Sequence, residues 1–299
     1  MLNYKFIYDD GFFEKAFIQL SLNELKVVMA TVLGGHHAIF YGYKPERLAN
    51  AVKMLRMNPD TTPFVEVPYT SSLEKLCGGG EDLHKGLVSE ADKGFLYVPN
   101  INDLTYAELS ILSVVMKEKR IHLSRAGENV THNADFQLVA TSQSCSCGGL
   151  DSDSPTCICS RDALKKWWSK SEGITKKCAI FYRCVKYDQK VSHSVAKLKK
   201  DIDRAWYNHK EFLNYEYVER GYYPTKNCEL QHSNHVHFTS SAKDLYKDLK
   251  ENGKYSEETL LNFARVARTF ADIEGHGMTY TNDLNDAREL YNNCVPYTE

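Results

Sequence analysis

Four cysteines in two closely spaced pairs are the residues of this chain with the clearest potential for chemistry. Cys145 and Cys147 form one Cys-x-Cys pair, and Cys157 and Cys159 form a second pair shortly after it. Thiols two residues apart are poorly placed to bridge each other, but two such pairs can converge on one tetrahedral ion. The loop 142–160 has few apolar side chains, so metal binding would supply its order. The pattern predicts a structural zinc; free thiols or an air-formed disulfide are the alternatives.

Positive charge and aromatic rings meet in a second segment just after these cysteines. Lys165, Lys166, Trp167 and Trp168 follow one another directly. Aromatic rings stack on bases and lysines follow phosphates, so this mixture is typical of single-stranded nucleic-acid binding. The alternative is a helix that buries its tryptophans beneath a solvated lysine fringe.

A third segment carries three histidines within six residues, His232, His235 and His237. Imidazoles at this spacing could bind a metal ion. Because no carboxylate or cysteine stands among them, we expect an ordinary loop instead.

The composition is that of a soluble globular protein with no global attraction for nucleic acid. Of 299 residues, 42% are hydrophobic and 25% charged, and 37 basic against 39 acidic residues give a net charge of −2. No stretch approaches the roughly 20 apolar residues of a membrane span. The first residues carry acids and no apolar core of a signal peptide. With nine cysteines in addition, we expect a cytoplasmic protein that does not contact membranes.

Apolar periodicity divides the chain into two parts. Up to about residue 190, short buried strands alternate with helices, which is typical of a mostly parallel sheet flanked by helices. The strands are expected at 38–41, 95–98, 136–140 and 180–182. After that point the pattern is helical to the end. The sequence predicts an α/β domain at 1–190, containing the cysteine-rich loop, and an all-α domain at 191–299.

Several local sequences resemble the magnesium-chelatase-like branch of the AAA+ ATPases, most closely its ComM type. Residues 265–275 read RVARTFADIEG, close to the RVARTIADLEG helix of the family's C-terminal lid. Residues 124–131 resemble its SRANGSVT hairpin, and residues 145–148 its CPCG motif. Residues 34–37 and 77–96 resemble its approaches to the phosphate loop and the Walker B strand. The resemblance implies an AAA+ α/β domain with a helical lid, a ring formed with itself or with AAA+ relatives, and a DNA partner.

The nucleotide-binding motifs that the resemblance implies are degenerate. Phosphate loops bind ATP through glycine-rich backbone, a lysine, and a hydroxyl residue for Mg²⁺. In the matching run 42–49, Arg47, Leu48 and Ala49 replace the second glycine, the lysine and the hydroxyl residue. Residues 98–100 read Val-Pro-Asn where the family strand ends in two acids. Since Mg²⁺ positioning and phosphate clamping supply most phosphoryl-transfer catalysis, we expect a pseudo-ATPase without ATP or Mg²⁺ as cofactors and without catalytic residues.

What remains of the implied nucleotide site is a set of five residues. Gly42 and Lys44 belong to the phosphate loop, and Gln143 stands at the sensor-1 position. Lys177 stands where an arginine finger is expected, and Arg268 at sensor 2. For Arg268 the alternative is a solvated helix face or a salt bridge at a domain interface.

Three functions are compatible with these observations. The one we expect is a catalytically inactive magnesium-chelatase-like AAA+ relative that acts as a scaffold, a regulator or a DNA- or protein-binding module. The second is an active Mg-ATP-dependent ATPase that acts on DNA, as ComM-like proteins do. The third is a zinc-stabilised nucleic-acid-binding module that needs no nucleotide.

Overall fold

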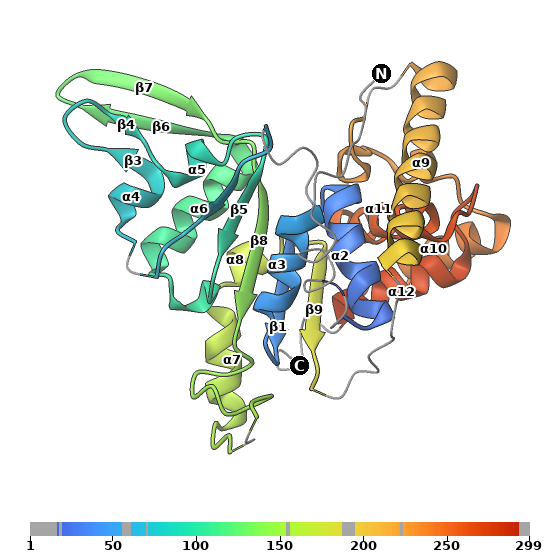
Figure 1. Cartoon of the computed structure of the whole chain (residues 1–299), viewed down its shortest axis with the longest axis horizontal. Coiled ribbons are helices and arrows are strands. Elements are labelled where there is room, and N and C mark those ends of the chain that lie inside the picture. Colours follow the sequence, from blue (N-terminus) through green and yellow to red (C-terminus); the bar gives the residue numbers. More distant parts are fainter. Residues whose placement is uncertain are drawn as a thin grey trace.

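The structure is a computed structural model, and it describes residues 17, 20–55, 61–69, 71–153, 156–186, 195–221 and 224–292. A five-stranded parallel sheet forms its centre (Figure 1), in the order β2-β5-β8-β1-β9. The strands are β1 (Ala38–Gly42), β2 (Phe64–Glu66), β5 (Phe95–Val98), β8 (Gln137–Ser142) and β9 (Ile180–Cys184). This confirms the predicted parallel sheet.

Both faces of the sheet are buried, which explains why its strands are continuous apolar runs. Along β1, Ala38 and Phe40 belong to one core cluster, whereas Ile39 and Tyr41 belong to the cluster on the other face. In the residues described, seven α-helices surround the sheet or lie in its connections: α2 (Leu22–Gly34), α3 (Glu46–Leu55), α4 (Leu73–Cys77), α5 (Leu87–Glu90), α6 (Tyr106–Glu118), α7 (Arg161–Ser169) and α8 (Glu172–Thr175).

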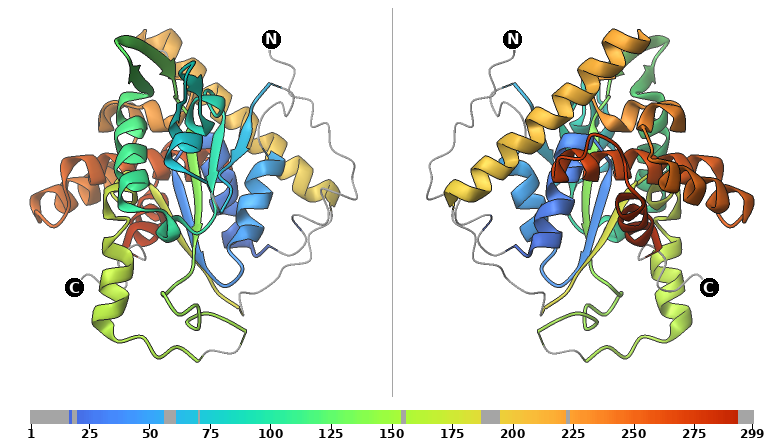
Figure 2. Two further views of the ribbon diagram at one scale, coloured as in Figure 1. Left: turned by 90° about the vertical axis from the view of Figure 1, so that its left-hand side faces the viewer. Right: turned by 90° about the vertical axis from the view of Figure 1, so that its right-hand side faces the viewer.

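Two hairpins extend from the amino side of the sheet. β6 (Arg120–Arg125) pairs with β7 (Glu128–Asn133) directly before β8 begins. β3 (Gly78–Gly79) pairs with β4 (His84–Lys85) next to it, and the His132 Nε2 atom lies 3.1 Å from the Leu83 carbonyl oxygen. The two hairpins lie side by side at the end of the molecule opposite α7 (Figures 1 and 2).

The C-terminal part of the chain is helical, as predicted. Its α-helices are α9 (Val195–Arg220), α10 (Ser240–Glu251), α11 (Glu257–Glu274) and α12 (Thr281–Asn292), with 3₁₀ turns η2 (Asn227–Glu229) and η3 (Ser233–Val236). Buried side chains of α9, α11 and α12 share one apolar cluster with α2 and α3, so the lid packs on the α/β body. The predicted boundary at residue 190 lies outside the described residues.

A buried histidine joins the body to the lid. The His36 side chain, 1% exposed, lies just before β1, with Nε2 2.9 Å from the Thr269 hydroxyl of α11. Thr269 donates its own proton to the Arg265 carbonyl at 3.0 Å, so His36 Nε2–H is the donor. Burial, with the nearby Arg265 charge, lowers the pKa of His36 from 6.5 to about 3.

This lowered pKa predicts a loss of stability in mild acid. Between pH 6.5 and about 3 the unfolded chain binds a proton at His36 that the folded chain does not. Stability therefore falls as the pH drops, by up to about 1.4 kcal/mol per pH unit from this group. Urea denaturation gives the free energy of unfolding at pH 7 and at pH 5. We expect His36→Gln to reduce the difference between these two free energies by about 2 kcal/mol. An unchanged difference would contradict this assignment.

Candidate functional site

The four cysteines of the loop 142–160 converge on one point, as the sequence predicts for a metal site. The Cys145 and Cys147 sulfur atoms are 3.4 Å apart, Cys147 and Cys157 are 3.7 Å apart, and Cys145 and Cys157 are 3.6 Å apart. With Cys159, all four sulfur atoms lie within 4.8 Å of one another. A tetrahedron with metal–sulfur bonds of about 2.3 Å has sulfur atoms about 3.8 Å apart. The cluster could therefore hold a metal ion.

Backbone amides donate hydrogen bonds to sulfur atoms of this cluster. Leu150 N–H donates to Cys145 at 3.3 Å, and Gly149 N–H to Cys147 at 3.4 Å. The Gly149 hydrogen bond and the neighbouring thiols lower the pKa of Cys147 from 9.0 to about 6. Hydrogen bonds of this kind orient metal ligands and stabilise thiolates.

The cysteine loop lies at the carboxyl edge of the sheet, where ligands bind in open α/β folds. Tyr41 of β1 is in register with Ser142 of β8, so the next residues, Gly42 and Gln143, end neighbouring strands. Gly42 has φ of 101°, and a Cβ there would lie 2.5 Å from the Cys184 carbonyl oxygen. Only glycine fits this turn. Gly42, Lys44 and Gln143 thus lie at one edge of the sheet.

The loop after β1 has little left with which to bind phosphate. Tyr43 N–H donates to the Cys184 carbonyl at 2.9 Å, and the N–H groups of Arg47 and Leu48 donate to carbonyls of their own turn. The Arg47 guanidinium turns back to the buried Glu24 carboxylate, 2.8 Å away. The side chains of Leu48 and Ala49, where lysine and a hydroxyl residue are needed, are 0% and 1% exposed. The loop therefore lacks, at these two positions, the lysine and the hydroxyl residue through which phosphate loops bind Mg-ATP.

Two acidic residues of the cysteine loop lie against this edge, and the sequence analysis missed both. Asp151 accepts two hydrogen bonds from the Arg183 guanidinium, at 2.7 and 3.0 Å, and one from Ser144 at 2.5 Å. Asp153 accepts one from the Tyr43 hydroxyl at 2.8 Å, and Lys44 and Lys186 lie 3.5 and 3.3 Å from its carboxylate.

These contacts keep Asp153 ionised: the Tyr43 hydroxyl first, then Lys186, hold its pKa below the ordinary 3.8. The acidic residues could have been found only through the pairing of β9 with β1, which brings together segments far apart in the chain.

Lys177 and Arg268, the other two residues predicted for the nucleotide site, lie at the opposite end of the sheet from Gly42, Lys44 and Gln143. Lys177 precedes β9 at the amino end of the sheet, since Ile180 pairs with Ala38, the first residue of β1. Arg268 is next to Thr269, which contacts His36 before the same end of β1. The reason is topological, because the lid packs against α2 and the amino ends of the strands.

Arg268 lies on a covered helix face and forms a buried salt bridge, as in one of the alternatives left open by the sequence. It is 1% exposed and binds Asp272, which is fully buried, through Nε at 3.0 Å and Nη2 at 2.7 Å. His209 Nδ1 and Asn227 Nδ2 lie 2.9 Å from the other Asp272 oxygen. Burial alone would raise the pKa of Asp272, but Arg268 and His209 hold it below the ordinary value. This network joins α11 to α9 and η2.

The tryptophans of the basic segment serve the fold. Trp168 is 5% exposed and packs edge-on against Tyr41 and Phe181, with ring centroids 5.1 and 5.2 Å away. Trp167 is half-buried and donates from Nε1 to the Gln143 carbonyl at 3.1 Å. The burial of Trp168 agrees with the alternative of a helix that buries its tryptophans, because α7 packs through this ring onto the sheet. Lys166 is exposed and Lys165 partly so.

The histidine loop does have a carboxylate neighbour, contrary to our expectation from the sequence. Glu216 of α9 is 0% exposed, and its two oxygen atoms contact His235, at 2.6 Å, and His237. Among the residues that the structure describes, the cysteine cluster alone brings three or more ligand atoms close enough for a metal. His235 and His237 therefore serve as hydrogen-bond partners of a buried carboxylate.

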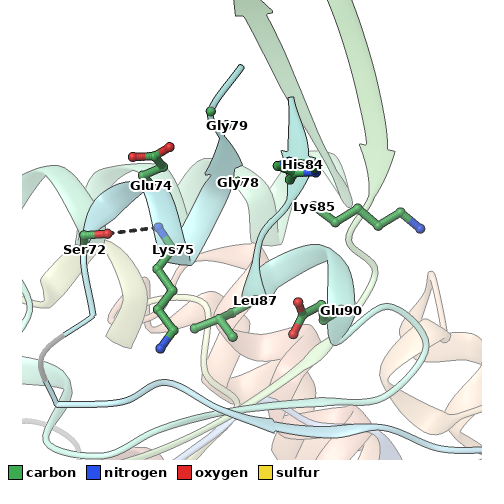
Figure 3. Close-up of a pocket in the computed structure, with 10 residues that line it drawn as sticks. Ser72, Glu74, Lys75, Gly78, Gly79, His84, Lys85, Leu87 and Glu90 are labelled. Carbon is green, nitrogen blue, oxygen red and sulfur yellow. Dashed lines mark hydrogen bonds between the residues drawn. The ribbon is translucent and has the colours of Figure 1, made fainter. Parts of the chain in front are cut away.

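A separate pocket of about 440 Å³ lies beside the β3–β4 hairpin (Figure 3). Glu74 and Glu90 contribute negative charge to it, and Lys75 and Lys85 positive charge. The mixed charge selects no class of ligand. The pocket is at the other end of the molecule from the cysteine loop (Figure 1).

The fold and this edge define a protein class, an α/β AAA+ type fold with a helical lid. The profile of the family described as "Magnesium chelatase, subunit ChlI" matches residues 48–190. Over this region the chain is therefore similar to the magnesium-chelatase-like family, as the sequence motifs indicated. Within the part of the chain that the structure describes, every helix is too short or too polar to cross a membrane.

Three relatives illustrate the similarity. An uncharacterised protein of Mycobacterium tuberculosis is 30% identical over 112 residues, which are 37% of this chain and 22% of that protein. The magnesium-chelatase 67 kDa subunit of Chlorobaculum tepidum is 32% identical over 93 residues, 28% of this chain and 15% of the subunit. The uncharacterised protein YifB of Salmonella typhimurium is 30% identical over 102 residues, 32% of this chain and 20% of YifB. The match covers about a fifth of the length of these relatives.

Proposed function

We propose that this protein is a non-hydrolysing magnesium-chelatase-like AAA+ protein that works as a scaffold or regulator, stabilised by one structural zinc ion. The observation that carries the proposal is the geometry of the loop 42–49. Three of its amides, those of Tyr43, Arg47 and Leu48, donate to the protein's own carbonyls, and its arginine is paired with Glu24. The positions of the lysine and the hydroxyl residue are buried apolar side chains. Without these groups neither Mg²⁺ nor the transferred phosphoryl group is held for attack by water.

Zinc is the proposed metal because four thiolates in a tetrahedron are a usual structural zinc set. Cys145, Cys147, Cys157 and Cys159 would be its ligands. Once bound, zinc supplies cross-linking of a loop that has little core of its own. All eight cysteines in the described part of the chain are unpaired, which supports a reducing compartment, and we place the protein in the cytoplasm.

The proposed partners are other AAA+ chains, either copies of this one or relatives. Fold and family support this, because AAA+ relatives commonly assemble into rings. A chain that does not hydrolyse ATP would contribute binding surfaces to such an assembly, but no ATP-driven conformational change. DNA is a second candidate partner, supported by Lys165 and Lys166 on the outside of α7.

We expect the purified chain to release phosphate from Mg-ATP no faster than a blank without protein. A coupled phosphate assay with and without Mg²⁺ measures this. The Lys44→Ala variant is the matched control, since Lys44 is the one cation of the loop that could still reach a phosphate. Activity that persists in this variant comes from contaminating ATPases. Mg²⁺-dependent turnover that Lys44→Ala abolishes would refute the proposal and favour an active ATPase.

A further inference from the structure

The cationic side chains around the carboxyl edge of β1 form a group suited to phosphates. Lys44 follows β1, Arg183 lies in β9, and Lys186 follows β9. The Tyr43 hydroxyl adds a hydrogen-bond donor, and Nζ of Lys44 lies 4.9 Å from the Tyr43 ring centre. A polyphosphate is bound by guanidinium, ammonium and phenol groups that converge on it. Here such groups converge at the carboxyl end of parallel strands, where ligands bind in open α/β folds.

Carboxylates of the cysteine loop already occupy these groups. Arg183 holds Asp151 in a two-pronged contact, with the Asp151 side chain 14% exposed. Asp151 also reaches the turn at Gly42, since its Oδ2 atom lies 3.4 Å from the place where a Cβ of Gly42 would be. Asp153 is shared by Tyr43, Lys44 and Lys186. Each cation therefore faces a carboxylate, at 2.7 Å for Arg183 and at 3.5 and 3.3 Å for Lys44 and Lys186.

The two contacts differ in strength. The Asp153 carboxylate and the Lys44 ammonium are 62% and 51% exposed, so this ion pair contributes little by itself. Asp151 is the anchor, because it is nearly buried, hydrogen-bonded by Ser144 and gripped in two places by Arg183. Asp151 also has φ of 62°, a conformation that non-glycine residues adopt only when their surroundings hold them.

The cysteine cluster supplies that hold. Asp151 follows Leu150, whose N–H donates to the Cys145 sulfur atom, and Ser144, which binds Asp151, precedes Cys145. Metal binding at the four thiols would therefore fix the segment that carries both acids.

We propose that Asp151 and Asp153 are an internal substitute for nucleotide phosphates, held by the four-cysteine metal loop, and that they close a latent polyphosphate-binding site formed by Lys44, Arg183, Lys186 and Tyr43. The metal part of this inference rests on the proposed function. The acidic part stands on the hydrogen bonds alone. The cysteine loop would thereby regulate polyphosphate binding, because release of the loop exposes four hydrogen-bond donors at once.

The test is isothermal titration of the full chain with inorganic tripolyphosphate, without Mg²⁺. We expect no measurable binding to the wild type, and at least about tenfold tighter binding to the Asp151→Asn/Asp153→Asn double variant. Asp244→Asn/Asp248→Asn, on the exposed face of α10, is the matched control. It changes the net charge equally and should behave like the wild type.

Two further arms locate the effect. Adding Lys44→Gln to the Asp151/Asp153 variant should return binding to the wild-type level. Removing metal from the wild type with a chelator should produce the same gain as the asparagine substitutions, and no gain would overturn the role of the metal. Equal affinity of the double variant and its control would overturn the internal substitute. ATP turnover by the wild type would instead refute the proposed function, so the two failures are distinguishable.

Discussion

Replacing Asp272 with alanine should destabilise the lid by about 3–5 kcal/mol, the range for breaking a buried ion pair on one side. The substitution leaves the Arg268 guanidinium 1% exposed without its counter-ion. Arg268 would keep only the His276 carbonyl at 2.8 Å, longer contacts to Gly277 and Thr279, and the Phe212 ring 4.6 Å away. His209 and Asn227 would lose an acceptor at the same time.

The matched control is an exposed ion pair with the same spacing. Lys247 and Glu251 of α10 are also four residues apart, 3.6 Å from each other, and their side chains are 73% and 65% exposed. Glu251→Ala should cost no more than about 0.5 kcal/mol. Urea denaturation gives both values, and native-state hydrogen exchange of the α11 amides shows whether the loss is local to the lid.

A second variant separates the role of charge from that of packing. Removing both charges, as in Arg268→Met/Asp272→Leu, should be less damaging than Asp272→Ala, since no uncompensated ion stays buried. If Asp272→Ala costs no more than Glu251→Ala, then the network does not join α11 to α9 and η2 as described. If the double variant is the most damaging of the three, packing and not charge is what Arg268 contributes.

The sequence predicted the sheet because buried parallel strands have a simple signature. Runs such as 38–41 and 95–98 are apolar on both faces, and the structure buries both faces. Arg268 shows the limit of such patterns. Charged residues on one side of a helix normally indicate solvent, and only the non-local approach of α9 and η2 reveals that this side is covered. A pattern within one helix carries no information about what packs on it.

The candidate site divides in the same way. Two Cys-x-Cys pairs predicted the thiol cluster, because the ligand spacing is itself local. No local pattern in the sequence indicated a role for Asp151 and Asp153 of the same loop. Their partners Arg183 and Lys186 follow some thirty residues later and contact them only because β9 pairs with β1. Lys177 was placed by resemblance alone, and the structure sets it at the other end of β9.

Replacing Cys147 with serine should weaken zinc binding strongly. Structural zinc sites bind with about 10–16 kcal/mol, so one of four ligands contributes roughly 3–4 kcal/mol, a loss of about 100-fold to 1000-fold in affinity. Cys147 is exposed and lies 3.4 and 3.7 Å from the sulfur atoms of Cys145 and Cys157. A hydroxyl there disrupts the cluster without disturbing a core.

Metal analysis of the protein purified under reducing conditions, with a competing chelator to measure affinity, tests this expectation. The wild type should carry one zinc per chain, and Cys228→Ser, a cysteine outside the cluster, should carry the same. Because the loop is ordered by the ion, Cys147→Ser should also lose hydrogen-exchange protection at the Gly149 and Leu150 amides, which donate to the cysteine sulfur atoms. A wild type that binds no zinc, or a Cys147→Ser variant that binds it as tightly, would leave the four thiols without a metal. The hold on Asp151 would then depend on Arg183 and Ser144 alone.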